Sequence, residues 1–312
     1  MKTKRVILMG GLGNQLFQYA FAMHLSGHQN TTILLDQNLG TIRRNRMNQP
    51  ELDGFGLSNR VGINDAKSST ILVKRIVGLL IRSHLKPNSI GILAFNRIIS
   101  LFAKIILSIH FKTNIKLYVA TDAGMNTNQI KDKNLFIGYF QSYRYSNSSD
   151  EYSELKKIAI RNLGVGYSYL ESKARDEMPL VVHVRLTDYR VEEKFGIPSL
   201  EYYRIAIERQ WETRRYRKIW LFSDDPEASL EFVPENYREF ISNLDVKELD
   251  SSQTLNAMRL GHGYVLANST FSWWSAYLSH TTEPIIMYPI PWFKGMPDPN
   301  DMFPEVWVPI PR

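Results

Sequence analysis

The chain contains no cysteine among its 312 residues. Disulfide bonds, thiolate metal sites and cysteine nucleophiles are therefore excluded, and the composition fits a reducing compartment. No uninterrupted apolar run is long enough to span a bilayer. The first residues resemble a secretory signal, but Asn14, Gln15 and Gln18 interrupt its apolar part, so we reject that interpretation. Internal repeats and low-complexity segments are also lacking.

Acidic residues are scarce in the first part of the chain. Residues 1–120 contain 16 Lys and Arg against 4 Asp and Glu, whereas residues 121–312 contain 22 against 27. The net charge of +7 therefore combines a strongly basic part with a mildly acidic one. Residues 66–121 contain nine basic residues and no acid at all. A surface of this kind suits either a nucleic acid or an anionic membrane.

One segment of this basic region has helical periodicity. Its apolar face comprises Ile98, Leu101, Phe102, Ile105, Ile106 and Ile109, and its polar face comprises Arg97, Ser100, Lys104 and Ser108. The pattern fits a surface helix whose apolar face packs on the protein, which is the commoner arrangement. It also fits a helix that lies in a membrane interface, and the lack of acids keeps this alternative open.

Hydrophobic residues make up 44% and charged residues 22% of the chain, which is enough to build proper cores. The length allows two domains, and we expect them at 1–165 and 166–312, with a hinge at Gly164-Val165-Gly166. Residues 40–66 are polar and are expected to form mainly loops. Strand-like and helix-like segments alternate along the remainder, which predicts an α/β fold.

The central segment is Leu180 to Tyr189 (LVVHVRLTDY). Its β-branched start predicts a buried strand of a parallel sheet, and ligands bind at the ends of such strands. Side chains alternate along a strand, so His183 and Arg185 should share one face near the ligand. The forked guanidinium of Arg185 suits a phosphate. Equally, Arg185 can cap the sheet edge through an ion pair with Asp188.

A second segment, Gly263 to Leu278 (GYVLANSTFSWWSAYL), predicts a strand, a polar turn at Asn268-Ser269-Thr270 and then a helix. The turn residues can cap the helix, and the free N–H groups of a helix start also attract anions. The turn can therefore act as cap and phosphate cradle at once. Trp273 and Trp274 are expected in the core.

The N-terminal strand runs into Gly10-Gly11-Leu12-Gly13-Asn14-Gln15 and a helix, so backbone can approach a ligand closely. This loop is neither a dinucleotide fingerprint, because Leu16 replaces the third glycine, nor a P-loop, because no lysine follows. By itself it is a weak signal.

Two further clusters have more than one interpretation. Aromatic residues alternate with polar ones around Gln141 and Ser142, and the aromatic members are Tyr139, Phe140, Tyr143 and Tyr145. They can line a sugar-binding surface or belong to the core. Farther along, Asp225-Pro226-Glu227 has the pattern of a helix start, which is a better explanation than a metal-binding acid pair. Asp224 is then left to contact a ligand.

Five segments together resemble one family. In chain order they are Gly10 to Gln18 (GGLGNQLFQ), Gly138 to Ser142 (GYFQS), His183 to Tyr189 (HVRLTDY), Ser223 to Asp225 (SDD) and Ala267 to Leu278 (ANSTFSWWSAYL). The set is similar to the α-1,2-fucosyltransferases of glycosyltransferase family 11, and specifically to bacterial members that modify surface polysaccharide. Together these segments reach from one end of the chain to the other and leave roughly residues 40–130 without a marker.

The resemblance implies an α/β fold of GT-B-like type, with two Rossmann-like domains that face each other across a cleft. Domain 1–165 would be the acceptor side and domain 166–312 would bind GDP-fucose. The expected donor-binding residues are Gly11, Gly13, Asn14, Gln15, Arg185, Ser223, Asp224, Asn268, Ser269, Thr270 and Phe271. The expected acceptor-binding residues are Tyr139, Gln141 and Ser142, and the expected catalytic residues are Arg185, Asp188 and His183.

Two positions depart from the family's pattern. Many relatives have Arg-Gly where this chain has Leu186-Thr187, so a second phosphate-binding arginine is missing. Thr254 stands where an acid often lies before the polar turn, and Asp250, one turn earlier, is the substitute we consider for guanine recognition.

The implied reaction is an inverting transfer of L-fucose to the 2-hydroxyl of a galactoside, in O-antigen synthesis, through an oxocarbenium-like transition state. Arg185 and the N–H groups of Ser269 and Thr270 would stabilise the departing GDP, so no metal and no other cofactor are expected. Asp188 is the candidate base, although it can instead only orient Arg185.

Two other functions fit parts of the sequence. One is a fucosyltransferase of another linkage, because the HxR element is shared among several such families, although the FSWW helix favours α-1,2. The other is a non-catalytic module that binds anions or a membrane surface through residues 66–121. The expected partners are a nucleotide-sugar donor and a galactoside or lipid-linked oligosaccharide acceptor, with no nucleic acid. The expected location is cytoplasmic, with peripheral contact to the inner membrane through residues 66–121.

Overall fold

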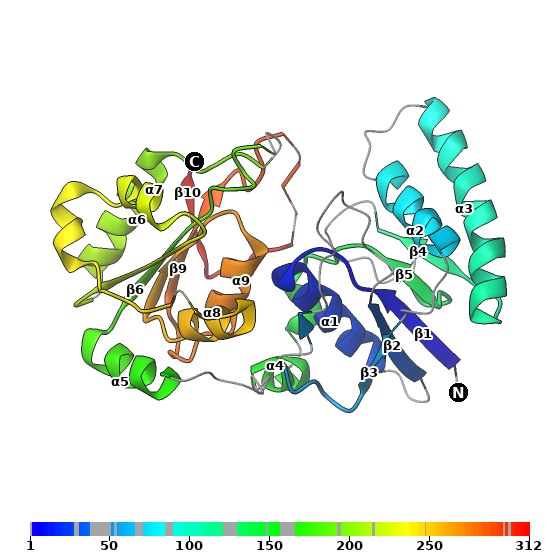
Figure 1. Cartoon of the computed structure of the whole chain (residues 1–312), viewed down its shortest axis with the longest axis horizontal. Coiled ribbons are helices and arrows are strands. Elements are labelled where there is room, and N and C mark those ends of the chain that lie inside the picture. Colours follow the sequence, from blue (N-terminus) through cyan, green and yellow to red (C-terminus); the bar gives the residue numbers. More distant parts are fainter. Residues whose placement is uncertain are drawn as a thin grey trace. The chain divides into compact units, whose positions relative to one another are not determined.

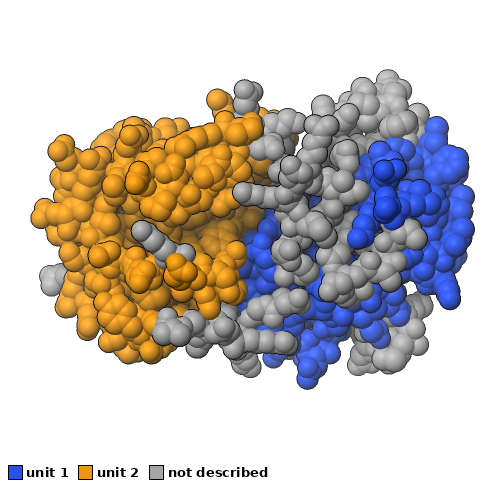
Figure 2. Space-filling model, viewed as in Figure 1, with its two compact units in different colours: residues 1–159, 299–303 blue, residues 160–298, 304–312 orange. Residues whose placement is uncertain are grey.

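The structure is a computed structural model of the whole chain. It describes residues 2–27, 31–37, 51–52, 55–65, 71–84, 90–120, 130–147, 149–156, 166–191, 195–213, 216–246, 248–295, 297–298 and 301–312. The chain forms two compact units (Figures 1 and 2). Unit 1 comprises Met1–Ala159 and Pro299–Phe303, and unit 2 comprises Ile160–Asp298 and Pro304–Arg312. The predicted hinge lies largely outside the described residues.

Unit 1 contains a five-stranded parallel sheet in the described residues. Its strands, in sheet order, are β3 (Val61–Asp65), β2 (Thr31–Gln37), β1 (Lys2–Ile7), β5 (Leu135–Ile137) and β4 (Leu117–Val119). β1 is central, with β2 and β3 on one side and β5 and β4 on the other. The winding direction therefore changes between β1 and β5.

The described residues of unit 1 also form helices. They are α1 (Leu12–Ser26), α2 (Ile71–His84), α3 (Ile90–Phe111) and α4 (Ser149–Lys156), with a 3-10 turn η3 (Tyr143–Ser146). α2 and α3 pack on each other and share one core cluster with β1, β4 and β5. In that cluster Val77 of α2 and Leu107 of α3 are completely buried.

The orientation of α3 corrects one expectation. Five of the six residues of its predicted packing face point to solvent, namely Ile98, Leu101, Phe102, Ile105 and Ile109. A second apolar stripe packs on the sheet instead, formed by Ala103 and Leu107 with the partly buried Ile99 and Ile106. The helix is thus apolar both on its core side and on its solvent side. No helix in the described part of the chain is long and apolar enough to cross a membrane.

Unit 2 contains a second five-stranded parallel sheet in its described residues. Its strands, in sheet order, are β10 (Val308–Pro311), β9 (Ile285–Ile290), β8 (Gly263–Val265), β6 (Leu180–Val184) and β7 (Ile219–Ser223). Its helices are α5 (Tyr167–Glu177), α6 (Leu200–Thr213), α7 (Pro226–Ser229), α8 (Ser251–Met258) and α9 (Thr270–Tyr277), with 3-10 turns η4 (Leu230–Phe232) and η5 (Glu235–Phe240).

The strand β6 is buried on both faces, as its β-branched sequence predicts. Val182 and Val184 pack in one cluster with Tyr202 and Tyr203 of α6. His183 lies on the opposite face, where its ring is 6.1 Å from the ring of Phe271 in α9. The predicted alternation along β6 is therefore confirmed. Trp273 and Trp274 are completely buried, which confirms their predicted place in the core.

The α/β class with two Rossmann-like units is confirmed by these two parallel sheets. Three strands are not predicted from the sequence: β3 lies in a segment expected to be loop-rich, β4 in the basic region, and β10 in the proline-rich tail. β10 pairs only with β9 at the sheet edge, where proline is tolerated because no inner hydrogen bond is lost. The expected cleft between facing domains, and the domain roles assigned to 1–165 and 166–312, stay predictions.

Candidate functional site

Three strand ends of unit 2 bring the predicted donor-binding residues of this unit to one edge of its sheet, whereas Gly11, Gly13, Asn14 and Gln15 belong to unit 1. The winding changes between β6 and β8, because β7 lies on one side of β6 and β8 on the other. Ligands of open parallel sheets bind at the carboxyl ends of strands at such a point. Arg185 follows β6, Asp224 follows β7, and Ser269 precedes α9 after β8. The sequence therefore correctly indicates which segments meet here.

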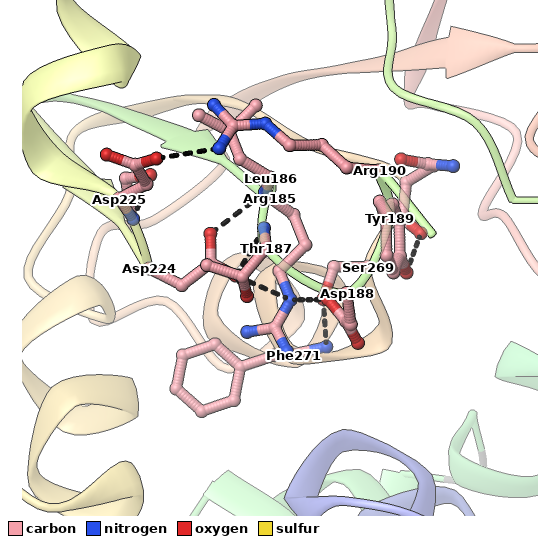
Figure 3. Close-up of polar contacts among 12 residues, drawn as sticks. Arg185, Leu186, Thr187, Asp188, Tyr189, Arg190, Asp224, Asp225, Ser269 and Phe271 are labelled. Atoms are coloured by element: carbon pink, nitrogen blue, oxygen red, sulfur yellow. Dashed lines mark hydrogen bonds and ion pairs between the residues drawn. The ribbon is translucent and has the colours of Figure 1, made fainter. Parts of the chain in front are cut away.

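The guanidinium of Arg185 is held by two carboxylates (Figure 3). Its Nε donates a hydrogen bond to Asp188 Oδ1 at 2.8 Å and lies 3.3 Å from Asp224 Oδ2. Among the described residues both contacts are made by Nε, so the terminal N–H groups are available for a ligand. The side chain is 34% exposed, which means that the ion pair does not bury it. Arg185 therefore forms the ion pair with Asp188 through Nε and still has its terminal N–H groups to offer to a ligand.

The carboxylate of Asp224 anchors the loop after β6. It accepts hydrogen bonds from the backbone N–H groups of Leu186 at 2.8 Å and Thr187 at 3.1 Å, and from the Thr187 hydroxyl. Burial raises the pKa of Asp224, but these hydrogen bonds and the charge of Arg185 outweigh burial, so its pKa lies below the ordinary value. Both carboxylate oxygens of Asp224 accept hydrogen bonds from Leu186 and Thr187, so Asp224 positions the loop after β6 and is not left to contact a ligand. Leu186 and Thr187 complete this anchor.

His183 is buried beside Arg185, with 5% of its surface exposed. Burial lowers the pKa of His183 to about 3, and the positive charge of Arg185 acts in the same direction. Its imidazole is therefore neutral and a weak base at physiological pH. This geometry does not support the expected catalytic role of His183, and it places the residue under the site as a packing group.

The helix α9 begins at this edge of the sheet. Ser269 is its N-cap and accepts a hydrogen bond from the backbone N–H of Phe271 at 3.3 Å. Thr270 and Phe271 are partly exposed at the helix start, and Figure 3 shows the Arg185 guanidinium pointing toward Ser269 and Phe271. The N–H groups and the dipole of this first turn add positive partial charge next to the guanidinium.

Asn268 has a structural function and does not fit the predicted contact with the GDP-fucose donor. It is 1% exposed, and its Nδ2 lies within 3.1 Å of three backbone carbonyls, those of Phe195, Gly196 and Trp292. The hydroxyl of Tyr189, in the Arg185 loop, donates to the backbone carbonyl of Asn268 at 2.9 Å. Asn268 and Tyr189 therefore fix the α9 turn relative to the Arg185 loop.

Two acidic residues that the sequence singles out, Asp225 and Asp250, are helix caps in the structure. Asp225 caps α7 by accepting from Ala228 N at 3.2 Å, which confirms the predicted helix start. The adjacent Ser223 hydroxyl accepts from Asp225 N at 3.1 Å and so belongs to the same turn. Asp250 caps α8 through a capping box with Gln253, so its carboxylate already has a local function beside the expected guanine contact. No cluster of three or more metal-binding side chains occurs among the described residues.

Unit 1 has its own polar edge, at the change of winding between β1 and β5. The amide of Gln18 accepts from Met9 N after β1 and donates to Gly138 O after β5, each at 2.9 Å. Gln141 Nε2 donates to Asn14 Oδ1 at 2.9 Å and joins the same two segments. Gln18 is completely buried and holds the two loops together, a function that only its place in the GGLGNQLFQ segment suggests.

The glycine-rich loop itself leaves space for a ligand at one position. Gly10 has φ +79°, and a side chain there would collide with Asn14, whereas a Cβ on Gly11 would meet nothing within 4 Å. Gly13 and Gln15 are buried in the start of α1, and Gln15 Nε2 donates to Gly10 O at 3.0 Å. They shape the loop, while Asn14 is partly exposed on it.

Glu51 is a residue of this edge that the sequence did not reveal. Its carboxylate accepts a hydrogen bond from Leu12 N, at the start of α1, at 3.1 Å, and its own N–H donates to Gln15 Oε1. A phosphate at the same helix start would meet this negative charge. The glycine-rich loop therefore suits neutral sugar hydroxyls better than the pyrophosphate of a donor.

The predicted acceptor residues occupy different environments. Gln141 is 8% exposed and bonded to Asn14, whereas Ser142 is completely buried and caps the turn at Arg144. Tyr139 is partly buried and packs on the α2 and α3 core cluster. Phe140 stacks on Phe21 at 3.9 Å. Phe140, Ser142 and Tyr145 are thus core, and of the three predicted acceptor residues only Tyr139 and Gln141 keep some exposed surface.

A parallel α/β fold with a guanidinium and a helix start at one sheet edge has the charge and geometry to bind a phosphate. Residues 92–308 match Glycosyl transferase family 11, and the chain belongs to this family of glycosyltransferases.

Two relatives from Escherichia coli match nearly the whole chain. An alpha-1,2-colitosyltransferase is 27% identical over 97% of this chain and 97% of its own length. The O-antigen biosynthesis glycosyltransferase WbnK is 24% identical over 92% of this chain and 94% of its own. Among solved structures, the fucosyltransferase NodZ from Bradyrhizobium is 14% identical over 89% of this chain and 94% of its own, with a TM-score of 0.47.

Proposed function

We propose that this glycosyltransferase transfers L-fucose from GDP-fucose to the 2-hydroxyl of a galactoside, with inversion, during O-antigen synthesis. The observation that carries the proposal is the Arg185 guanidinium, whose Nε is fixed by Asp188 and Asp224 while its terminal N–H groups stay open next to the start of α9. Membership of the family and the O-antigen relative support the reaction class and its setting.

The proposed chemistry is electrostatic. Negative charge grows on the β-phosphate as the sugar departs, and donors fixed in advance stabilise that charge most. Arg185 supplies a forked charged donor, and the first turn of α9 supplies the backbone N–H of Thr270. The N–H of Ser269, also expected to contribute, donates to Ala267 O at 2.8 Å, and that of Phe271 donates to Ser269 Oγ. Asp224 and Tyr189 hold these two elements in place. In this proposal the positive groups replace a divalent metal, and no other cofactor takes part.

Asp188 is the proposed base. Its side chain is 45% exposed, so a substrate hydroxyl can reach it, and its position is set by the 2.8 Å bond to Arg185 Nε. The alternative is that Asp188 only orients Arg185. The two functions differ in their response to Asp188→Asn, since the amide keeps an oxygen for Nε but cannot accept a proton from the hydroxyl.

The proposed acceptor side is the polar edge of unit 1. Asn14, Gln141 and Tyr139 supply an amide oxygen, a second amide and an aromatic ring, which suit the hydroxyls and apolar face of a sugar. The Glu51 carboxylate at the start of α1 makes the same edge unfavourable for a phosphate. Donor and acceptor chemistry are thus divided between the two units.

A second donor sugar is favoured by one observation. The relative that is 27% identical is named for colitose, which is L-fucose without its 3-hydroxyl. The same phosphate and nucleotide contacts serve both donors, so the sugar pocket alone would distinguish them. A pocket built to hydrogen-bond the 3-hydroxyl would reject colitose strongly, because its polar groups would lose their partner.

The test is a product assay with purified protein, lactose and either GDP-fucose or GDP-colitose. NMR of the trisaccharide identifies the new linkage and the anomeric configuration, and a parallel reaction with EDTA tests metal dependence. We expect an α-1,2 product whose yield EDTA does not change. A different linkage, or activity that only a divalent metal restores, would refute the corresponding part of the proposal, and turnover of GDP-colitose alone would favour the second donor.

A further inference from the structure

Helices α2 and α3 expose apolar side chains on their outer faces. The two helices lie side by side in unit 1 (Figure 1), and both pack on the same sheet through one core cluster. Eight of the fourteen exposed large hydrophobic residues in the described part of the chain lie on them, each between 49% and 72% exposed. They are Ile71, Leu72, Leu79, Ile98, Leu101, Phe102, Ile105 and Ile109. We call these eight side chains the α2–α3 face.

The α2–α3 face is not explained by packing within unit 1. Helical residues are offset by about 100°, so Leu101 and Ile105 point away from the sheet that Ala103 and Leu107 contact. The six other exposed large hydrophobics lie in unit 2, on separate elements. Scattered apolar side chains are normal on a soluble surface, whereas eight of them on two helices that pack against each other indicate an interaction site.

Charge identifies the kind of partner. Arg75, Arg97, Lys104 and Lys112 are exposed on the same two helices or just after them, and residues 66–121 contain no acid. A second copy of this chain would place these cations against their own copies in a two-fold interface, which is unfavourable. A nucleic acid would satisfy the cations but would leave the apolar side chains exposed. An anionic lipid surface satisfies both.

We infer that the α2–α3 face docks on an anionic phospholipid surface. The apolar side chains enter the boundary between headgroups and acyl chains, and the flanking lysine and arginine residues contact the phosphates. Each cation near such a surface strengthens binding about fivefold. Figure 2 shows unit 1 in blue, and its α2 and α3 side would face the membrane. A lipid-linked acceptor would be presented at that surface.

The test uses the full chain in a flotation assay with two kinds of vesicle. One contains 30% phosphatidylglycerol in phosphatidylcholine, and the other contains phosphatidylcholine alone. The key variant is Leu101→Ser/Phe102→Ser/Ile105→Ser, and the charge variant is Arg97→Gln/Lys104→Gln. The matched control is Val191→Ser/Val306→Ser, which removes two exposed apolar side chains from unit 2. All of these side chains are exposed, so circular dichroism and melting temperatures should show intact folds.

We expect binding to the phosphatidylglycerol vesicles that weakens with added salt, falls at least tenfold in the apolar variant and at least fivefold in the charge variant, and is unchanged in the control. Absence of vesicle binding, or equal binding by the apolar variant, would overturn the inference. So would dimerisation in analytical ultracentrifugation that the apolar variant abolishes, or preferential binding of a DNA duplex. The assay reads lipid binding and not turnover, so its failure would leave the proposed reaction untouched.

Discussion

Replacement of Arg185 by alanine separates its two interpretations, phosphate binding and capping of the sheet edge. As a phosphate ligand, Arg185 provides charged hydrogen bonds worth about 1.5–3 kcal/mol. Its loss should therefore raise the Kd for GDP about 10- to 100-fold. Because the same donors act on charge that grows in the transition state, kcat should fall by about 10²–10³.

The effect on stability should be small. Arg185 and Asp188 are 34% and 45% exposed, and ion pairs of this kind contribute about 0.2–1 kcal/mol. The Asp224 carboxylate keeps its two backbone donors and the Thr187 hydroxyl without Arg185, so the loop after β6 stays anchored. We expect the melting temperature to change by less than about 4 °C.

The assay is isothermal titration with GDP, combined with steady-state kinetics. Arg190→Ala is the matched control, because Arg190 lies in the same loop, is 52% exposed and pairs with Asp225 at 3.0 Å. It removes one positive charge without touching the proposed phosphate fork. Arg185→Lys should recover only part of the affinity, since lysine keeps the charge but loses the planar fork. GDP affinity within twofold and kcat within fivefold of wild type for Arg185→Ala would refute the assignment.

Three further predictions concern neighbouring residues. Asp188→Asn removes a negative charge beside the phosphates but keeps an oxygen for Arg185, so the affinity for GDP should rise about two- to fivefold. Because the amide cannot act as a base, kcat should fall at least about 100-fold, and a kcat within fivefold of wild type would exclude Asp188 as the base. Asp224→Asn should lower the free energy of unfolding by about 1–3 kcal/mol at pH 7, measured by urea denaturation. The pKa of Asp224 is lowered in the folded state, so the contribution of its carboxylate to the free energy of unfolding is complete above the ordinary pKa and is lost as pH falls through the folded-state pKa. An equal difference between wild type and variant at pH 7 and at pH 3 would contradict the anchoring function of Asp224. The folded-state pKa of His183 is about 3, so the unfolded chain takes up this proton at a higher pH than the folded chain does. The free energy of unfolding of the wild-type protein should therefore fall by about 2 kcal/mol between pH 6.5 and pH 5 on account of this residue. His183→Leu should abolish that loss and keep kcat within about tenfold, whereas an unchanged pH dependence or a 100-fold fall in kcat would contradict its packing role.

The parts of the fold that the sequence predicts are those with strong local patterns. β6 is a short β-branched run, α9 follows a polar turn, and Asp225-Pro226-Glu227 starts a helix, and each signal lies within about ten residues. The sequence does not predict β10, because its prolines argue against an inner strand although they are compatible with an edge strand.

The parts that local patterns cannot supply depend on distant contacts. Glu51 and Leu12 are 39 positions apart, and Asp224 lies 38 positions from Leu186, so no local pattern links either pair. For α3, periodicity reveals an apolar face but not which of two apolar faces meets the sheet, because burial is decided by the other elements of the unit. Asn268 was likewise identified as important by its position, but its function depends on carbonyls as far as 73 positions away.

The most direct test of the proposed donor is nucleotide-selective stabilisation of the wild-type protein. In a thermal-shift experiment GDP, UDP and ADP are each added at the same concentration. A ligand that binds the folded state stabilises it by about 2.7 kcal/mol at 100 times its Kd. We predict a clear rise in melting temperature with GDP and little or none with UDP and ADP. Equal shifts with all three nucleotides, or no shift with GDP, would contradict the account.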